Sequence, residues 1–549
     1  MDADIVIKGG RVADGTGQDI YDADVAISDG KVVAVGDGLS GRRTVDADGC
    51  LVAPGFIDIH THYDPQVTWD PWLTPSSTLG VTSVVGANCG YSIVPCRPEM
   101  RGLMMRTLEA TEDMSLETLE AGIPWSFESY GQYLAALRTR GLGINFGAYV
   151  GHTAIRIWVM GDDAYEREAT SDEIETMRQA VVQAINEGAL GFSTNRAGNL
   201  RGDRGRPVPS MVATQEETET LCMAVSDAAR GIVSIAAGNN PAFAYRLAER
   251  LGRTITWNSI LAMDNKNMMS WQDKLACHIE GRKRTPDVHP QVTPRELTFV
   301  WTLVNPLGFA SYPLFAEIPR ADRGERIRRF RDPAWRDQAR QATDERAHRW
   351  DQMTIAVAAT PALAGRRLVD VAAEMQGHPL DVMLDIALAE DLATQFSAVV
   401  ANSDPDAVAT LLTSEGCVLG LSDAGAHVSQ ICDAVLPIDF LSKWVRDKKL
   451  MSVGAGIRKL TGELADVMGF TGRGYLRPEA HADIVILDWE QLATGPVERV
   501  RDLPSEGERL VATHPQGIRH IFVNGQATRR DGERVEAGVR AGMVLDPKR

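Results

Sequence analysis

Short apolar runs that read as buried strands alternate with amphipathic helical stretches over residues 54–477, and this alternation constrains the fold more than any other feature. The predicted strands are FIDIH, VTSVVGANC, NFGAYVGH, ALGFST, GIVSIAAG, RTITWNSI, DVHPQV and CVLGLSD. A helix with a Ser-Asp start and a glycine stop, SDEIETMRQAVVQAINEG, precedes the fourth run. Eight such repeats favour an α/β protein with a (β/α)₈ TIM barrel.

The two ends of the chain carry a different pattern. Residues 1–53 and 478–549 alternate apolar and polar residues in short runs broken by Asp-Gly and Asn-Gly pairs, which are hairpin signals. Neither segment can bury a core alone, so we expect them to pack together as one small β-sandwich domain. Within the barrel segment, the Arg-, Asp- and Glu-rich stretch near 318–352 reads as a solvated helical insertion.

Composition excludes several classes of function. The chain has 549 residues, 44% of them hydrophobic, and a net charge of −17 that disfavours nucleic acid and anionic membranes as partners. No stretch reaches the roughly 18 apolar residues of a membrane span, and the N-terminus lacks secretion signals, so we expect a cytoplasmic protein. Seven scattered cysteines do not read as a disulfide framework, and any special cysteine should be a thiol or a ligand.

The segment PGFIDIHTHYDP ends the first predicted strand with two histidines. Because residues i and i+2 of a strand project to the same face, His60 and His62 would lie side by side. The carboxyl end of a barrel strand is also where such folds place their chemistry. A single histidine is more often structural, but this pair and its flanks favour two metal ligands.

Further polar residues follow other predicted strands: Cys89 after the second, His152 after the third and Asp423 after the eighth. Thiolate, imidazole and carboxylate are the usual ligands of zinc. These residues are scattered along the chain, so no spacing establishes the site, and Cys89 could instead be a buried structural thiol.

With these residues, the sequence resembles the amidohydrolase superfamily, and within it the N-acyl-D-amino-acid deacylase (D-aminoacylase) branch. The resemblance spans almost the whole chain and is carried by PGFIDIHTHYD, GVTSVVGANCG, GHTAIRIWVMG, EGALGFSTNR, QVTPRE, LSDAGAH and ADIVILD. It implies that His60 and His62 are strand-one metal ligands and Cys89 the cysteine ligand. It also implies that Asp423 binds metal, orients the attacking water and carries its proton.

The sequence also departs from the family pattern. A histidine is expected at the ends of strands five and six, but these places read GIVSIAAGNN and RTITWNSIL, and strand four lacks the lysine that bridges two metals in some members. We therefore expect one Zn²⁺ ion in place of two, although another divalent metal stays open. Asp423 could act as a base more than a ligand, and His152 or His289 could replace a missing histidine.

The resemblance implies a metal-dependent hydrolase of amide bonds, with N-acyl D-amino acids as substrates. The alternatives are a lactone, ester or cyclic imide as substrate, a non-hydrolytic reaction such as decarboxylation, or a relative that binds a metabolite without turnover. Arg196, Arg295 and Arg320 are open candidates for a substrate carboxylate. We expect a small-molecule substrate and a homo-oligomer. The substrate-binding candidates are Tyr63, Asn88, His152, His289, Arg295 and His427.

Overall fold

The computed structural model describes residues 3–197, 200–263, 268–309, 312–315, 318, 321–346, 348–535 and 539–546. The chain divides into two compact units. The first comprises Met1–Arg295, Pro405–Val428 and Cys432–Arg549, and the second comprises Glu296–Asp404 and Ser429–Ile431. In the described part of the chain, no helix is both long and apolar enough to cross a bilayer.

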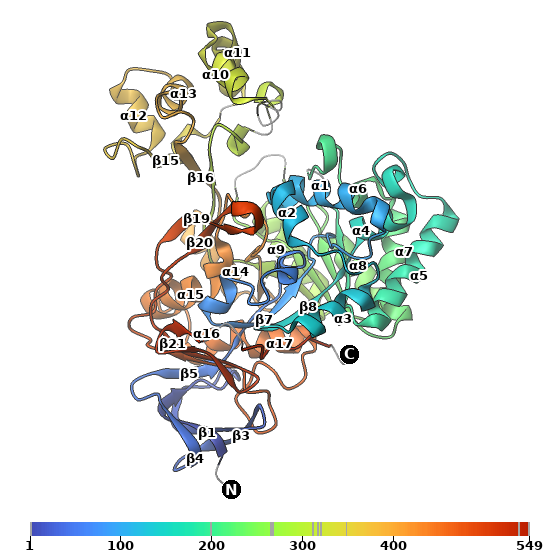
Figure 1. The fold of residues 1–549 in the computed structure, drawn as a ribbon, viewed down its shortest axis with the longest axis vertical. Helices are drawn as coiled ribbons and strands as arrows, with labels where there is room; N and C mark the ends of the chain where they lie inside the picture. The colour runs from blue at the N-terminus through green and yellow to red at the C-terminus, as the bar shows by residue number, and fades with distance from the viewer. Residues whose placement is uncertain are drawn as a thin grey trace. The chain divides into compact units, whose positions relative to one another are not determined.

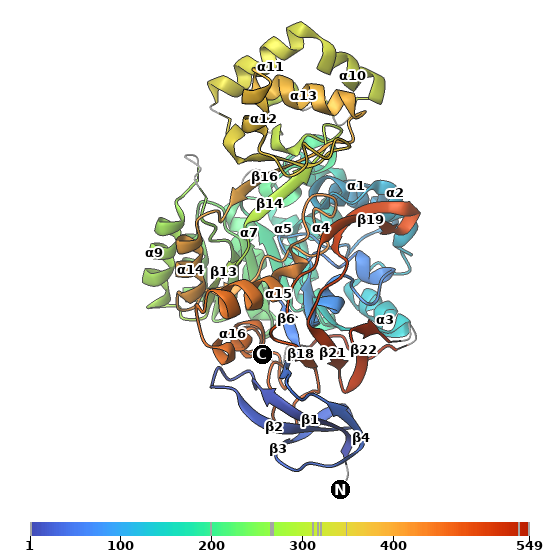
Figure 2. The same ribbon diagram turned by 90° about the vertical axis from the view of Figure 1, so that its left-hand side faces the viewer.

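Strands from both ends of the chain share one sheet in the first unit (Figures 1 and 2). Its order is β23-β22-β21-β18-β5-β1-β2-β3, with β4 also paired to β1. The bounds are β1 Ala3–Val12, β2 Tyr21–Ser28, β3 Lys31–Gly36, β4 Gly41–Asp46, β5 Leu51–Pro54, β18 Ile484–Leu487, β21 Ile518–Val523, β22 Gln526–Arg530 and β23 Glu533–Arg534. The antiparallel β18–β5 pair, with Val485 opposite Ala53, joins the two chain ends.

The hairpins of this sheet turn where the sequence predicted them. Asn524 and Gly525 connect β21 to β22 with φ of 45° and 78°. Positive φ at both central residues is the type I′ geometry, which suits the right-handed twist of the paired strands. Asp29-Gly30, between β2 and β3, has the same pattern with φ of 49° and 75°.

Parallel strands form the core of the first unit. One sheet has the order β6-β7-β8 and another the order β9-β10-β11-β12-β13-β17, with Tyr149 as the single residue between β8 and β9. The bounds are β6 Phe56–Asp58, β7 Val81–Gly86, β8 Asn145–Ala148, β9 Val150–Gly151, β10 Gly191–Asn195, β11 Ile232–Ala236, β12 Ile255–Asn258, β13 Val288–Val292 and β17 Val418–Leu419. Each lies inside a run that the sequence predicted as a strand, except that β10 continues one residue further, to Asn195.

Helices pack beside these strands because each buries an apolar stripe against them. Helix α5 covers Ser171–Glu187 and begins with a capping box between Thr170 and Glu173, as the sequence signals indicate. Further helices between the strands are α3 Tyr130–Arg140, α4 His152–Met160, α7 Gln215–Asp227, α8 Ala242–Leu251, α9 Trp271–Arg282 and α14 Pro405–Thr413. Figure 1 shows α5, α7 and α8 along one side of the strands.

The segment after β17 lies beside the end of the first parallel strand. Thr61 and Ala424 form a parallel bridge, and His62 N donates to Ala424 O at 2.8 Å. Gly425 permits this approach, because a Cβ at its φ of 89° would lie 2.8 Å from His62 O. The carboxyl ends of the first and last predicted strands are therefore neighbours.

The second unit has its own antiparallel sheet and core. Its sheet order is β14-β16-β15, with β14 Leu297–Trp301, β15 Met353–Val357 and β16 Gln395–Ala401. Its helices are α10 Arg323–Arg331, α11 Pro333–Glu345, α12 Leu368–Glu374 and α13 Pro379–Ala389. Helices α10 and α11 fall within the stretch near 318–352 that reads as helical, whereas the sheet was not predicted.

Candidate metal centre

The two histidines of the first strand lie side by side and buried. His60 and His62 follow β6, are 0% and 4% exposed, and have ring centroids 5.6 Å apart. The strand anchors them, because Asp58 Oδ1 accepts a hydrogen bond from His60 N at 3.2 Å. Side chains held this way lose little further entropy when they bind a ligand.

Cys89 and Asp423 complete a compact cluster with the histidines. One ligand atom each from His60, His62 and Cys89 lie within 4.8 Å of one another. Cys89 Sγ is 3.4 Å from His60 Nε2. Asp423 Oδ1 is 3.0 Å from His60 Nε2 and 3.8 Å from His62 Nε2. The cluster thus joins side chains from the first, second and last predicted barrel strands.

The backbone at Cys89 and Asp423 is in the left-handed region, with φ of 55° and 44°. Non-glycine residues held there cost on the order of 1 kcal/mol or more and gather at functional sites. Asn88 secures the loop at Cys89, since its amide nitrogen donates to Ile59 O, Thr61 O and Val85 O. The predicted substrate-binding residue Asn88 is therefore a buried brace between the first two strands.

Two residues that the sequence analysis missed contact the outer nitrogens of the histidines. Gln291 Oε1, in β13, lies 2.6 Å from His60 Nδ1. Glu112 Oε1, at the end of α1 (Arg101–Glu112), lies 3.4 Å from His62 Nδ1. Both imidazoles consequently direct Nε2 toward the same region, beside Asp423.

A third missed residue, Asn258, ends β12 and donates from Nδ2 to Cys89 Sγ at 3.5 Å. Strand β11 ends at Ala236. The last residues of these two strands are thus an alanine and an asparagine, and neither is a histidine. The amides at the ends of RTITWNSI and DVHPQV were visible in the sequence, but Glu112 carried no signal in its neighbourhood.

The electrostatics of the cluster favour a cation at its centre. Burial alone would lower the pKa of His60, but the Cys89 thiolate and the Asp423 carboxylate outweigh it and raise that pKa to about 10. Burial likewise opposes ionisation of Cys89 and Asp423, yet the histidines lower the pKa of both groups. The site therefore contains two anionic groups beside two imidazoles. A divalent metal ion would stabilise these groups in the role that protons otherwise take.

The residues fit a zinc ion on this chemistry. Two imidazoles, one thiolate and one carboxylate are all groups that bind zinc, and four ligands are the number in a tetrahedral zinc site. A catalytic zinc keeps one position open, which would leave Asp423 at its edge as a proton acceptor.

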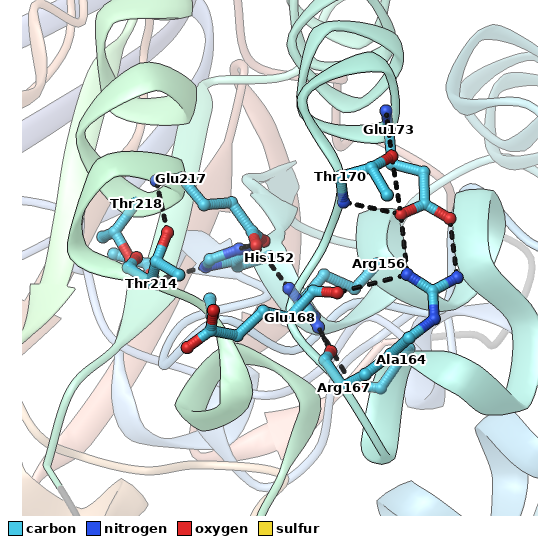
Figure 3. A network of polar contacts seen from close by, with 12 residues as sticks. His152, Arg156, Ala164, Arg167, Glu168, Thr170, Glu173, Thr214, Glu217 and Thr218 are labelled. Atoms are coloured by element: carbon cyan, nitrogen blue, oxygen red, sulfur yellow. Dashed lines mark hydrogen bonds and ion pairs between the residues drawn. The ribbon is translucent and has the colours of Figure 1, made fainter.

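His152 lies in a different network, shown in Figure 3. Its Nδ1 is 2.8 Å from Thr194 Oγ1 and its Nε2 is 2.9 Å from Glu217 Oε1. Glu217 also pairs with Arg156, and all three side chains are fully buried. Since both ring nitrogens have protein partners, His152 does not stand in for a missing metal ligand.

The other predicted residues take separate places. Tyr63 is fully buried with its hydroxyl 2.8 Å from Ser76 Oγ. His289 Nδ1 lies 3.3 Å from Gly416 O, and His289 lines a cavity with Ile232 and Thr254 at the amino ends of β11 and β12. The structure thus brings neither of them to the cluster. His427 is half-buried, and it is among the groups whose proximity contributes to the lowered pKa of Asp423, after His60 and His62.

The candidate arginines for a substrate carboxylate differ in whether an acidic side chain already pairs with them. Arg295 Nε is 2.9 Å from Asp433 Oδ1, and its NH1 is 3.5 Å from Asp439 Oδ1. Arg196 follows β10, and its NH1 donates to Ala213 O at 2.9 Å. Within the described ranges, no carboxylate lies within 4.0 Å of the Arg196 guanidinium. Arg320 lies outside the described residues.

An α/β fold with a His, Cys and Asp cluster at the ends of its parallel strands is the arrangement expected of a metal-dependent hydrolase. The chain belongs to the amidohydrolase family, whose sequence model matches residues 43–535. A D-aminoacylase from Alcaligenes xylosoxydans xylosoxydans is 27% identical over 558 residues, which cover 99% of this chain and 97% of that relative. These matches confirm the resemblance read from the motifs.

Solved structures agree with this assignment. A crystal structure of D-aminoacylase matches with a TM-score of 0.68 and 25% identity, covering 99% of this chain and 100% of that one. A structure of N-acyl-D-glutamate deacylase from Bordetella bronchiseptica, complexed with zinc and a phosphonate inhibitor, matches with a TM-score of 0.68 and 24% identity over 99% of this chain and 100% of that one. The fold is that of the amidohydrolases.

Proposed function

We propose that this protein hydrolyses the amide bond of N-acyl D-amino acids with one zinc ion held by His60, His62 and Cys89. The observation that carries the proposal is the cluster of two buried histidines with the partly exposed Cys89 and Asp423. Relatives named D-aminoacylase and N-acyl-D-glutamate deacylase, each 27% identical to this chain, support the substrate class.

The residues suggest a division of labour. A zinc ion, when bound, would lower the pKa of a water molecule and polarise the scissile carbonyl. Asp423 Oδ1 would accept a proton from the attacking water, and its lowered pKa keeps it ionised for this role at neutral pH. The same proton would then pass to the leaving nitrogen as the C–N bond breaks. The products are a carboxylate and a free amine.

We propose one metal ion because the positions that would serve a second are occupied by Ala236 and Asn258. A related D-aminoacylase has a binuclear centre with one-metal activation and second-metal attenuation. Elemental analysis of the purified protein should find one zinc per chain, retained on dialysis. Two tightly held ions per chain would contradict this proposal.

Arg196 is the proposed partner of the substrate carboxylate. It follows the end of β10, its backbone N donates to Ala236 O at 2.8 Å, and burial lowers the pKa of its guanidinium. Glu217 acts on this guanidinium only from beyond ion-pair distance, so a substrate carboxylate would supply the direct partner that it lacks among the described residues. Arg295 is already satisfied by Asp433 and Asp439.

The substrate is tested by assaying N-acyl-D- and N-acyl-L-amino acids beside lactones and cyclic imides. Release of free amino acid from the D-compounds supports the proposal. Exclusive turnover of lactones or imides would favour the alternative that the altered ends of β11 and β12 suggest. A protein that contains no zinc, iron or manganese and gains nothing from them would be the metabolite-binding relative.

We further propose that the parallel strands close into a barrel and that the terminal strands form one β-sandwich domain, 1–53 with 478–549. The Thr61–Ala424 bridge and the β18–β5 pair support these two statements. Deletion of residues 490–549 removes β21 and β22 and should leave a poorly soluble chain. A fully active truncation would contradict the domain proposal. The expected cytoplasmic location and homo-oligomeric state stay predictions.

A further inference from the structure

The carboxyl end of helix α1 lies against the proposed metal centre. Glu112 is the last residue of α1 and is 3% exposed. A carboxylate at the C-terminus of a helix faces the negative end of the helix dipole, and burial adds a further cost. Such a residue needs a compensating partner.

His62 is that partner. Glu112 Oε1 lies 3.4 Å from His62 Nδ1, and in the described part of the chain His62 is the one basic side chain within 4.0 Å of it. Both atoms are buried, and neither has a hydrogen-bond partner among the described residues. A proton on Nδ1 is the simplest way to satisfy both atoms, and it leaves the Nε2 lone pair directed toward Asp423, 3.8 Å away.

We infer that Glu112 is a positioning residue of the metal centre: its carboxylate holds His62 in the tautomer whose Nε2 binds metal. This inference rests on the metal centre proposed above. A histidine ligand commonly donates its second N–H to a carboxylate, which orients the ring and strengthens it as a ligand. Glu112 also connects to the opposite side of the site, since its carbonyl oxygen accepts from Val428 N at 3.3 Å.

The two histidines are supported differently. The neutral amide of Gln291 contacts His60 Nδ1, whereas a charged carboxylate faces His62 Nδ1. A neutral amide oxygen is enough to contact the His60 ring, so a carboxylate at the His62 ring adds a charge to the same kind of contact. We therefore expect the charge of Glu112 to matter separately from its hydrogen-bonding oxygen. Glu112→Gln tests this directly, since it keeps the shape and one acceptor oxygen and removes the charge.

The experiment measures Co²⁺ affinity from the visible absorption of the reconstituted full-length protein. Glu112→Gln should lose about 10- to 100-fold in affinity. Glu120→Gln, the same change at an exposed position of the neighbouring helix α2 (Leu116–Gly122), should match the wild type. Equal affinities in the wild type and a folded Glu112→Gln would overturn the inference and leave the metal centre intact.

A second measurement does not require Glu112→Gln to fold. In the zinc-loaded wild type labelled with ¹⁵N-histidine, the His62 resonance, assigned by its loss in His62→Gln, should report a proton on Nδ1. A proton on Nε2 would overturn the inference. Failure of the wild type to bind Co²⁺ or Zn²⁺ would reject the proposed metal centre itself, and the inference with it.

Discussion

His60 Nε2 lies 3.0 Å from Asp423 Oδ1, so the end of the first parallel strand directly contacts the segment that follows the last. The contact is supported by a neighbouring bond, in which Ser422 Oγ donates to His60 O at 3.0 Å. Asp423 is thus fixed beside the histidines by backbone and side chain together. Its role as proton acceptor is open to a direct test.

Asp423→Asn should reduce turnover by about 10²- to 10⁴-fold, because it removes the basic oxygen while keeping size and much of the hydrogen bonding. Substrate binding should change far less, so the loss falls on kcat. Zinc should be retained, since His60, His62 and Cys89 still hold it. Loss of zinc together with activity would instead make Asp423 a principal ligand, and near-normal kcat would remove it from the mechanism.

Cys89→Ser should lower zinc content strongly, because a neutral hydroxyl is a poor replacement for a thiolate. Cys96→Ser is the matched control, since Cys96 is fully buried and burial raises the pKa of its thiol to about 12. Zinc per chain, measured by elemental analysis after dialysis, should fall only in the Cys89 variant. Equal zinc in both variants would make Cys89 structural.

The strands and the HxH, Cys and Asp residues were predictable because each leaves a local pattern. His60 and His62 are set by the two-residue period of β6 and its continuation, and Asn524-Gly525 is set by the positive φ of its turn. Glu112 was not predictable in this way, because nothing in the neighbouring sequence distinguishes it. The amide of Asn258 was visible at the end of a predicted strand, but its contact with Cys89 joins distant parts of the chain.

For His152, the position was predictable from the sequence but the contacts of its side chain were not. Its place after a predicted strand was read correctly, but the sequence could not reveal that Thr194 and Glu217 would engage both ring nitrogens. Figure 3 shows the contact with Glu217. Arg295 was ambiguous for the same reason, because its pairing with Asp433 depends on a segment far along the chain. The residue type predicts which chemistry a side chain could perform. Tertiary contacts decide whether its polar atoms are already occupied by other residues of the protein.

Arg196→Met should raise KM by about 10- to 100-fold with a smaller effect on kcat, the expected loss of a hydrogen-bonded ion pair with the substrate. Arg295→Met should behave differently. It leaves the buried carboxylate of Asp433 without its guanidinium partner, whereas Asp439 keeps its ion pair with Lys443, so the free energy of unfolding should fall by about 3–5 kcal/mol. Steady-state kinetics and urea unfolding of both variants separate these effects, and an unchanged KM in Arg196→Met would reject Arg196 as the carboxylate partner.

The second unit should lose stability as the pH falls below neutrality, because of His348. Its ring stacks on Phe309 with centroids 4.8 Å apart, and burial lowers its pKa from 6.5 to about 4. Between these values the unfolded chain binds a proton that the folded unit does not, so the free energy of unfolding decreases as the pH falls from 6.5 to 4.

For this residue alone, the loss approaches roughly 3 kcal/mol as an upper limit, since each pKa unit corresponds to about 1.4 kcal/mol. Above pH 6.5 His348 contributes no pH dependence. Hydrogen exchange of peptides from residues 296–404, followed by mass spectrometry, measures the local opening free energy at each pH. His348→Gln removes the titrating group and should flatten the slope between pH 6.5 and 4. An equally steep slope in the variant would show that other groups cause the acid sensitivity.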